Sequence, residues 1–313
     1  LFPYTTLFRS WMFWAGVVPA LVLLVGMCFV PETPRWLLSK GRLKECRKVL
    51  QKIEPENTVN DLIGQMEVEI EKDRNSAVGW RYLMQPWLRT PLMIAVCIMF
   101  FQQFVGINTV IYYSPKIFLM AGFESTLSAI WASVGIGIVN VVFTVISLYL
   151  VDRIGRRKLY FIGLSGIAFS VLCLSACFIY ANQLGEIGRW LMVIFMFGYV
   201  AFFAISIGPL GWLVISEIFP QKVRGLGTSI GSLAVWIFNC IVSFTFFKII
   251  DFFSIPGTEI VVGQTTSENP AGAFFLYGFI AVLGLVWGYL FLPETKGLSL
   301  EEIEQKWRKN REC

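Results

Sequence analysis

The chain contains no histidine and few charged residues. Histidine is missing from all 313 positions, and only 15% of the residues are Asp, Glu, Lys or Arg. The sequence also shows no phosphate-binding loop and no nucleophile beside a base, so we expect no catalytic residue and no enzyme activity. Cys173 and Cys177 share a helix face, but they have no histidine or carboxylate partner. We interpret them as small apolar residues at helix contacts, and we expect neither a metal nor any other cofactor.

The sequence contains long apolar runs. Hydrophobic residues make up 56% of the sequence, more than in a typical soluble domain. Several runs reach the ~20 residues that cross a bilayer. The predicted fold class is an all-α polytopic membrane protein, with the lipid bilayer as a partner. The net charge of +5 does not indicate nucleic acid as a partner, because the basic residues lie beside the apolar runs.

Seven apolar runs are predicted to be membrane-spanning helices. They lie at residues 11–30, 88–113, 126–151, 159–181, 190–216, 225–250 and 272–292. Residues 31–87 form a polar insert whose apolar spacing predicts two short amphipathic helices. The apolar positions of the two helices are Leu43, Val49, Leu50 and Ile53, then Val59, Leu62, Ile63, Met66 and Ile70. A loop at 251–271 and a tail at 293–313 complete the predicted organisation.

The two ends of the chain suggest a part of a longer protein. Residues 1–10 look like the translation of a sequencing adapter, so we treat them as an artefact and expect the protein proper to begin near Trp11. The tripeptides Pro31-Glu32-Thr33 and Pro293-Glu294-Thr295 each follow an apolar run and precede a basic stretch. This repeat indicates two homologous halves. We expect only the second half to be complete here, with a missing N-terminal bundle as its partner.

Lysine and arginine are distributed unevenly between the two sides of the predicted membrane. We place 31–89 in the cytoplasm and let the later segments alternate. All but four of the 26 Lys and Arg residues then fall on the cytoplasmic side, the exceptions being Arg9, Lys116, Arg189 and Lys248. This bias follows the positive-inside rule. It predicts a plasma (inner) membrane protein with a cytoplasmic insert and a cytoplasmic C-terminus.

The most unusual polar residues lie in the apolar run 88–113. Gln102, Gln103 and Asn108 are costly at membrane depth unless they face protein or a water-filled cavity. Positions 102 and 108 lie about 240° apart on a straight helix and cannot share a face. Gly106 offers a place for the helix to break and bring them together. Amides both donate and accept, which suits the hydroxyls of a sugar or polyol, although hydrogen bonding between helices would also explain them.

Further motifs follow at predicted span ends. They are Pro31-Glu32-Thr33-Pro34-Arg35, Asp152-Arg153-Ile154-Gly155-Arg156-Arg157-Lys158, Gly208-Pro209-Leu210-Gly211-Trp212 as a span break, Ser216-Glu217-Ile218-Phe219-Pro220 with Arg224-Gly225, and Pro293-Glu294-Thr295-Lys296-Gly297. With the amide cluster, they resemble the sugar porter family of the major facilitator superfamily. The resemblance implies twelve helices in two six-helix bundles. This chain would supply helix 6 (11–30), a cytoplasmic helical insert (31–87) and the complete C-terminal bundle (88–292).

The resemblance also implies which residues contact the substrate. They are Gln102, Gln103, Asn108, Tyr112, Asn140, Trp212 and Trp236. An indole can stack on a sugar and donate a hydrogen bond. Taken alone, Asn140 would fit a helix contact equally well, and Trp212 an interfacial or packing position. Asn239 is a weaker candidate. Val235 stands where hexose and pentose carriers often have an amide, so we name no particular sugar.

The resemblance also implies a second set of residues, which would open and close the two ends of the transport path. Tyr113 resembles part of an outer gate. The others resemble a cytoplasmic latch that holds the outward-facing state, and they are Glu32, Arg35, Asp152, Arg153, Arg156, Arg157, Glu217, Arg224 and Glu294. Arginine pairs well with carboxylates. The ordinary excess of cytoplasmic positive charge is the alternative explanation for the arginines.

The predicted function is transport of a monosaccharide (hexose or pentose) or related polyol by alternating access, with proton symport in the intact protein. The alternatives are a facilitative uniporter and a non-transporting membrane sugar sensor, and the short tail favours transport. An uncharged site is a poor match for an organic ion. The acid that would couple protons is implied on the first helix, which we expect to be missing. We therefore expect residues 11–313 not to transport on their own.

Overall fold

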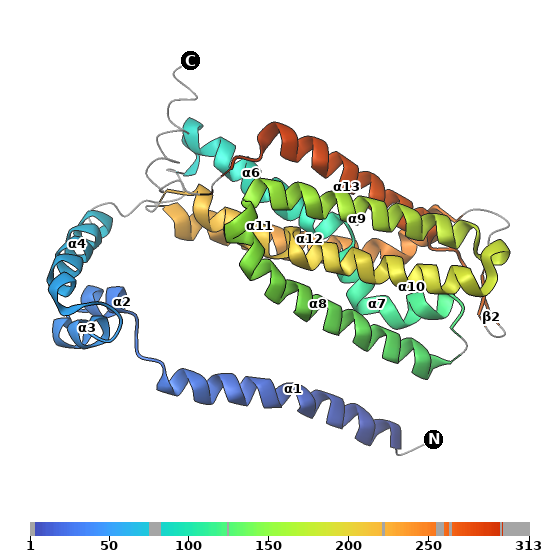
Figure 1. Cartoon of the computed structure of the whole chain (residues 1–313), viewed down its shortest axis with the longest axis horizontal. Coiled ribbons are helices and arrows are strands. Elements are labelled where there is room, and N and C mark those ends of the chain that lie inside the picture. Colours follow the sequence, from blue (N-terminus) through green and yellow to red (C-terminus); the bar gives the residue numbers. More distant parts are fainter. Residues whose placement is uncertain are drawn as a thin grey trace. The chain divides into compact units, whose positions relative to one another are not determined.

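The computed structural model describes residues 4–74, 83–123, 125–220, 223–254, 260–262, 265–294 and 296. The chain divides into two compact units, Leu1–Ala77 and Val78–Cys313. Helices make up almost all of the described structure (Figure 1). Six helical segments of the second unit are long and apolar enough to cross a membrane. The predicted all-α class is therefore confirmed.

The first unit begins with the apolar helix α1, Tyr4–Phe29, which spans most of the predicted helix 11–30. Helices α2 (Pro34–Ser39), α3 (Leu43–Leu50) and α4 (Glu56–Arg74) follow. Pro34 is the first residue of α2, where its missing N–H costs nothing. The side chain of Thr33 accepts a hydrogen bond from the Trp36 backbone N–H at 3.4 Å and caps this helix. The first proline motif therefore ends one helix and starts another.

The insert has a small apolar core of its own. Its buried residues are Leu37, Leu38, Cys46, Leu50, Val59 and Ile63. The two predicted amphipathic helices are confirmed, but the inclusion of Ile53 was wrong. Helix α3 ends at Leu50, so Ile53 falls in a turn and is 69% exposed. Burial, and secondarily the charge of Glu67, raises the pKa of the Cys46 thiol above its ordinary value of 9.0.

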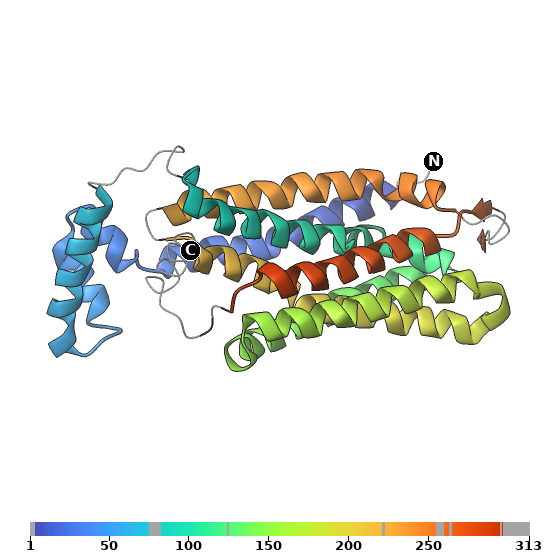
Figure 2. The ribbon, with the colours of Figure 1, turned by 90° about the horizontal axis from the view of Figure 1, so that it is seen from above.

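The second unit is a helical bundle. After a short 3-10 turn at Pro86–Leu88, its helices are α6 (Arg89–Phe104), α7 (Ile107–Met120), α8 (Thr126–Ile154), α9 (Arg156–Ile179), α10 (Ala181–Ile205), α11 (Ile207–Ile218), α12 (Arg224–Phe252) and α13 (Ala271–Phe291). Two of the predicted spans are thus broken, into α6 with α7 and α10 with α11. The predicted loop 251–271 also holds two short strands, β1 (Ile260–Val262) and β2 (Thr265–Ser267), which pair antiparallel at one end of the bundle (Figure 2).

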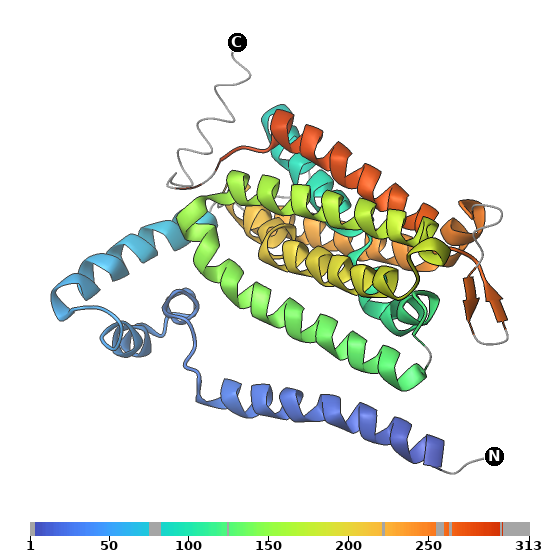
Figure 3. The ribbon, with the colours of Figure 1, turned by 45° about the vertical axis from the view of Figure 1, so that its right-hand side comes forward.

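Helix α9 lies at the centre of the packing in this unit. It packs along both α10 and α13 (Figure 3), while α6 packs along α12 (Figure 2). Glycines allow the close approach: a Cβ at Gly163 would overlap Ser206, and one at Gly288 would overlap the ring of Tyr160. The Tyr160 hydroxyl donates to the Gly284 carbonyl at 2.9 Å. These contacts hold α10 and α13 against α9, and the candidate substrate contacts lie on α6, α7, α8, α11 and α12.

Candidate functional site

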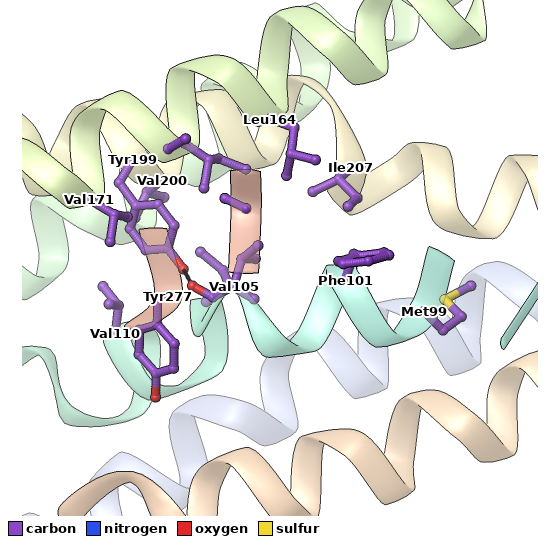
Figure 4. Close-up of a cluster of buried hydrophobic side chains, with 14 of the residues drawn as sticks. Met99, Phe101, Val105, Val110, Leu164, Val171, Tyr199, Val200, Ile207 and Tyr277 are labelled. Atoms are coloured by element: carbon purple, nitrogen blue, oxygen red, sulfur yellow. Dashed lines mark hydrogen bonds between the residues drawn. The ribbon is translucent and has the colours of Figure 1, made fainter. Parts of the chain in front are cut away.

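The break between α6 and α7 is built around Gly106. This residue has φ +87°, in the left-handed region that favours glycine. A Cβ at this position would overlap the ring of Tyr277. The freed carbonyls have partners: the Tyr199 hydroxyl donates to the Val105 oxygen at 2.9 Å (Figure 4), and the Thr109 hydroxyl donates to the Gly106 oxygen at 2.7 Å. The predicted break at Gly106 is therefore confirmed.

The break brings the three predicted amides into one hydrogen-bonded chain. Asn108 Nδ2 donates to Gln103 Oε1 at 2.6 Å, and Gln103 Nε2 donates to Gln102 Oε1 at 3.2 Å. Gln102 and Gln103 are 2% and 5% exposed, while Asn108 is only partly buried. Residues 102 and 108 are thus connected through Gln103, and both glutamines are largely enclosed by the bundle.

The break between α10 and α11 lies at Ser206, with φ −127° and ψ −103°, and not at Gly208-Pro209 as predicted. Pro209 explains the difference. Its ring excludes the carbonyl four residues earlier, that of Ile205, so the helix ends there. Pro209 itself fits in the first turn of α11, where an N–H is not needed. The Ser147 hydroxyl satisfies the Ile205 carbonyl at 2.9 Å.

Gln102 connects the two breaks. Its Nε2 donates to the carbonyl of Ile207 at 3.1 Å and to that of Gly208 at 2.7 Å. Gly211 makes room for this amide, because a Cβ there would lie 2.8 Å from Gln102 Nε2. The chain of amides therefore runs from Asn108 in α7 to the backbone of α11.

The tyrosines of α7 contact α12. The Tyr112 hydroxyl accepts from Asn239 Nδ2 at 3.5 Å, and Asn239 Oδ1 accepts from the Ser243 hydroxyl at 3.1 Å. Tyr113 donates to the Ser243 carbonyl at 3.4 Å, and its ring stacks on Phe246 at 5.5 Å. Asn239 is 9% exposed and is more closely tied to Tyr112 than its sequence position indicated. A polar residue one turn after Trp236 was the only available signal.

The two predicted tryptophans are solvent-accessible on the bundle. Trp212 is 44% exposed and Trp236 is 66% exposed, whereas Val235 is buried in the core. Trp212 lines a cavity of about 450 Å³ together with Asp152, Arg156 and Pro209. The indoles are therefore accessible, but Trp236 does not share this cavity.

Asn140 on α8 is half-buried. Its backbone carbonyl and its Oδ1 accept from the Thr144 hydroxyl at 2.7 and 3.4 Å. Within the described residues, no hydrogen bond joins Asn140, Trp212 or Trp236 to the amide chain. The structure thus brings together some of the predicted substrate contacts and leaves others apart.

Charged residues cluster where α8, α9 and α11 end or begin. Arg156 Nη2 lies 3.0 Å from Glu217 Oε1, and Arg156 Nη1 lies 3.3 Å from Asp152 Oδ1. The side chains of Arg156 and Glu217 are 14% and 22% exposed, while that of Asp152 is 77% exposed. The pair with Glu217 is therefore the better shielded of the two. Together the two pairs join predicted latch residues of three helices.

Glu294 caps the start of α9. Its two carboxylate oxygens accept from the backbone N–H groups of Arg156 and Arg157 at 3.1 and 3.2 Å. A carboxylate at this position also interacts favourably with the helix dipole. Gly155, with φ +94°, turns the chain here, and a Cβ on it would lie 3.0 Å from Glu294 Oε2. The Lys296 ammonium donates to the Arg153 carbonyl at 2.7 Å.

The remaining latch candidates have different surroundings. Arg157 Nη2 donates to the Tyr289 carbonyl at 2.8 Å. Arg224 has two buried nitrogens, Nε and Nη2, without a hydrogen-bond partner among the described residues. The side chain of Arg153 is exposed. Glu32 and Arg35 belong to the first unit, so their part in a latch stays a prediction. Most of the predicted tail, 297–313, lies outside the described residues.

The chain is similar to known proteins in both sequence and fold. The family model described as sugar (and other) transporter matches residues 6–307. The glucose transporter GlcP of Staphylococcus epidermidis is 36% identical, with 95% of this chain and 62% of the relative covered. The D-xylose-proton symporter of Escherichia coli K12 is 34% identical, with 95% of this chain and 57% of the relative covered.

The solved structures include one of the proton:xylose symporter XylE bound to 6-bromo-6-deoxy-D-glucose. It matches with a TM-score of 0.74 and 33% identity, over 95% of this chain and 58% of that one. The chain therefore spans less than two thirds of the length of each of these relatives.

Proposed function

Because the chain belongs to the sugar (and other) transporter family, we propose that the complete protein carries a monosaccharide (hexose or pentose) or related polyol across a membrane by alternating access. The chain is part of a multi-pass membrane protein, and its relatives are transporters rather than enzymes. The observation that carries the proposal is the amide chain at the α6/α7 break. It places neutral donors and acceptors at membrane depth beside a discontinuous helix, the usual setting of a transporter substrate site.

The proposed substrate contacts are those named from the sequence. Asn108 is the strongest of them, because it is partly accessible and stands at the open end of the amide chain. Trp212 and Trp236 offer exposed indoles for stacking on a sugar ring. Gln102, Gln103, Tyr112 and Asn140 would contribute through their remaining hydrogen-bonding groups. The names of the relatives, which include a glucose transporter and a xylose symporter, support a hexose or pentose as substrate.

We propose proton symport for the complete protein. The similarity to a D-xylose-proton symporter supports it, and a facilitative uniporter is the alternative. A second proton-linked relative, the arabinose-proton symporter of Bacillus subtilis, is 31% identical. Reconstituted vesicles distinguish the two mechanisms. A symporter accumulates labelled xylose or glucose when an inward proton gradient is imposed, whereas a uniporter only equilibrates the sugar.

The proposed site is tested by Asn108→Ala in the complete transporter. Removing one amide that contacts a sugar hydroxyl costs about 1–3 kcal/mol, so the KM should rise about fivefold or more. Asn182→Ala, at an exposed position of α10, is the matched control and should leave the KM unchanged. Equal KM values in both variants would contradict the site. Sugar binding without any transport would instead favour a membrane sugar sensor.

The orientation and the latch are proposed together. The distribution of Lys and Arg supports a plasma (inner) membrane location with the insert and the C-terminus in the cytoplasm. On this side the pair of Arg156 with Glu217, and Glu294 on the α9 terminus, would fasten the cytoplasmic ends of the helices. We propose that this latch stabilises the outward-facing state, and that Tyr113 belongs to the gate at the opposite end.

A further inference from the structure

The insert carries its charge in two separate blocks. Residues 35–52 contain seven Lys or Arg and a single acid, Glu45, whereas residues 53–73 contain seven Asp or Glu and a single base, Lys72. The basic block spans α2 and α3, and the acidic block covers most of α4. The proposed latch uses only Arg35 from these two blocks. Sugar transport therefore leaves most of this charge separation without a role.

The basic block contains four lysines at intervals of four residues, namely Lys40, Lys44, Lys48 and Lys52. All four are exposed. Their ammonium groups form no ion pair or hydrogen bond with another residue that the structure describes. Cys46 and Leu50 of α3 are buried in the core of the insert. Lys44 and Lys48 occupy the opposite side of this helix and point away from that core.

The neighbouring charges do not neutralise these lysines. Arg42 donates to both carboxylate oxygens of Glu45 at 2.8 and 2.7 Å, and Arg47 donates to Asn60 Oδ1 at 2.8 Å. The acids Glu56, Asp61, Glu67 and Glu71 of α4 are themselves exposed. No ion pair joins α3 to α4 among the described residues. The four lysines thus keep their charge available for an anion outside the insert.

Apolar side chains accompany the lysines. Trp36 is 40% exposed and Leu43 is 42% exposed, and the guanidinium carbon of Arg42 lies 6.0 Å from the centre of the Trp36 ring. Lysines together with exposed tryptophan and leucine are typical of segments that lie at the headgroup level of a bilayer.

The membrane is also within reach of this surface. Four connecting residues and the six-residue helix α2 separate Phe29, the end of α1, from Lys40. Extended residues span at most about 3.5 Å each, and α2 adds about 9 Å. Lys40 therefore lies no farther than about 25 Å from the end of α1, which is the predicted membrane helix 11–30.

We propose that the insert docks on the cytoplasmic surface of the membrane through Lys40, Lys44, Lys48 and Lys52, which bind the phosphate groups of anionic phospholipids. The same surface repels the acidic helix α4, so α4 faces away from the membrane and the docked insert has one orientation. Each lysine near an anionic bilayer strengthens such binding about fivefold, and salt weakens it. This inference goes beyond the proposed function, because it needs α1 to cross the membrane but needs no sugar to be transported.

Hydrogen exchange of the complete transporter in lipid nanodiscs tests the docking. At low salt, a peptide covering 40–52 should exchange about tenfold more slowly in phosphatidylglycerol than in phosphatidylcholine. The difference should disappear in about 1 M salt, where the Debye length is about 3 Å. It should also disappear when Lys40→Gln, Lys44→Gln, Lys48→Gln and Lys52→Gln are combined. Arginine at the same four positions is the matched control and should preserve it, while a peptide covering 56–71 of α4 should exchange equally in both lipids.

Several outcomes would overturn the proposal. Equal exchange of 40–52 in the two lipids would do so, and this comparison uses the unmodified protein, so a folding defect in a variant cannot affect it. A lipid difference that survives the four glutamine substitutions would show that the lysines are not the contacts. Slower exchange in phosphatidylcholine on addition of inorganic phosphate would indicate a site for soluble anions instead of a membrane surface. If the unmodified protein transports no sugar, the proposed function fails, and the exchange experiment still decides whether the insert docks.

Discussion

Gly106 determines how the residues of the candidate site meet. Its left-handed backbone ends α6 and starts α7, and the ring of Tyr277 occupies the space where a side chain would be. Tyr199 supports the same break by donating to the Val105 carbonyl. Three features therefore favour this turn: the backbone conformation of Gly106, the lack of space for a side chain, and the hydrogen bond from Tyr199. A turn fixed in this way can hold Asn108 in position to bind Gln103.

Gly106→Ala should destabilise the bundle. A left-handed conformation costs a non-glycine residue about 1–2 kcal/mol, and the overlap with Tyr277 adds to this cost. Thermal unfolding of the purified chain in detergent measures the effect. The control is Gly64→Ala in α4, where a Cβ meets no atom within 4 Å, and this change should be neutral or raise stability by up to about 1 kcal/mol. Equal melting temperatures for the two variants would contradict the role assigned to Gly106.

For the amide cluster, some contacts could be predicted from the sequence and others could not. Helical geometry alone predicts that residues 102 and 108 can meet only if the helix breaks, and Gly106 is the natural place. The destination of the Gln102 donors could not be predicted. Its partners are backbone carbonyls more than a hundred residues away. Every residue has such a carbonyl, so the sequence does not indicate which one accepts the hydrogen bond.

At the scale of elements, the start of α9 depends on a residue from the far end of the bundle. Glu294 follows α13, yet it accepts from the first backbone N–H groups of α9. The first four N–H groups of a helix have no partner within the helix. The second Pro-Glu-Thr motif therefore fastens the end of α13 to the start of α9. The first motif does something different, because there Thr33 caps the adjacent helix α2.

Glu294→Gln should weaken this connection. The amide retains one acceptor oxygen but loses the negative charge and the second acceptor, a loss of about 1 kcal/mol. Hydrogen exchange in the first turn of α9 should accelerate, and the melting temperature should fall by a few degrees. Glu186→Gln, at an exposed position of α10, is the control. If α9 exchanged equally in both variants, the carboxylate would not be acting as a cap.

Element boundaries were harder to predict than element types. The apolar runs identified every long helix of the bundle. Pro209 was correctly associated with a break, but the break lies at Ser206, because a proline disrupts the turn that precedes it. In the insert, Leu37 and Leu38 form part of the core although they follow Pro34. A proline at the first position of a helix is easily mistaken for the end of the one before.

For the molecule as a whole, the described charge cluster joins two consecutive helices, α8 and α9, to α11, which is more distant in sequence. Arg156 at the start of α9 reaches Asp152 at the end of α8 and Glu217 at the end of α11. Helix α11 is also the element to which Gln102 donates. The same short helix therefore takes part in both the candidate substrate site and the proposed cytoplasmic latch. A movement of α11 at one of these sites would therefore also move the residues that α11 contributes to the other.

Glu217→Gln should therefore shift the complete transporter toward inward-open states. Arg156 would then keep a full ion pair only with Asp152, which is well exposed and contributes little, so the population should shift roughly fivefold or more. A cysteine introduced by Leu148→Cys, beside Trp212 in the cavity, reports the change through its rate of labelling by a polar thiol reagent. The control is Glu45→Gln, which breaks the exposed pair of Arg42 and Glu45 at 2.7 Å in the insert. Labelling should accelerate for Glu217→Gln alone, and equal rates in the two variants would mean that the pair with Arg156 does not hold the outward-facing state.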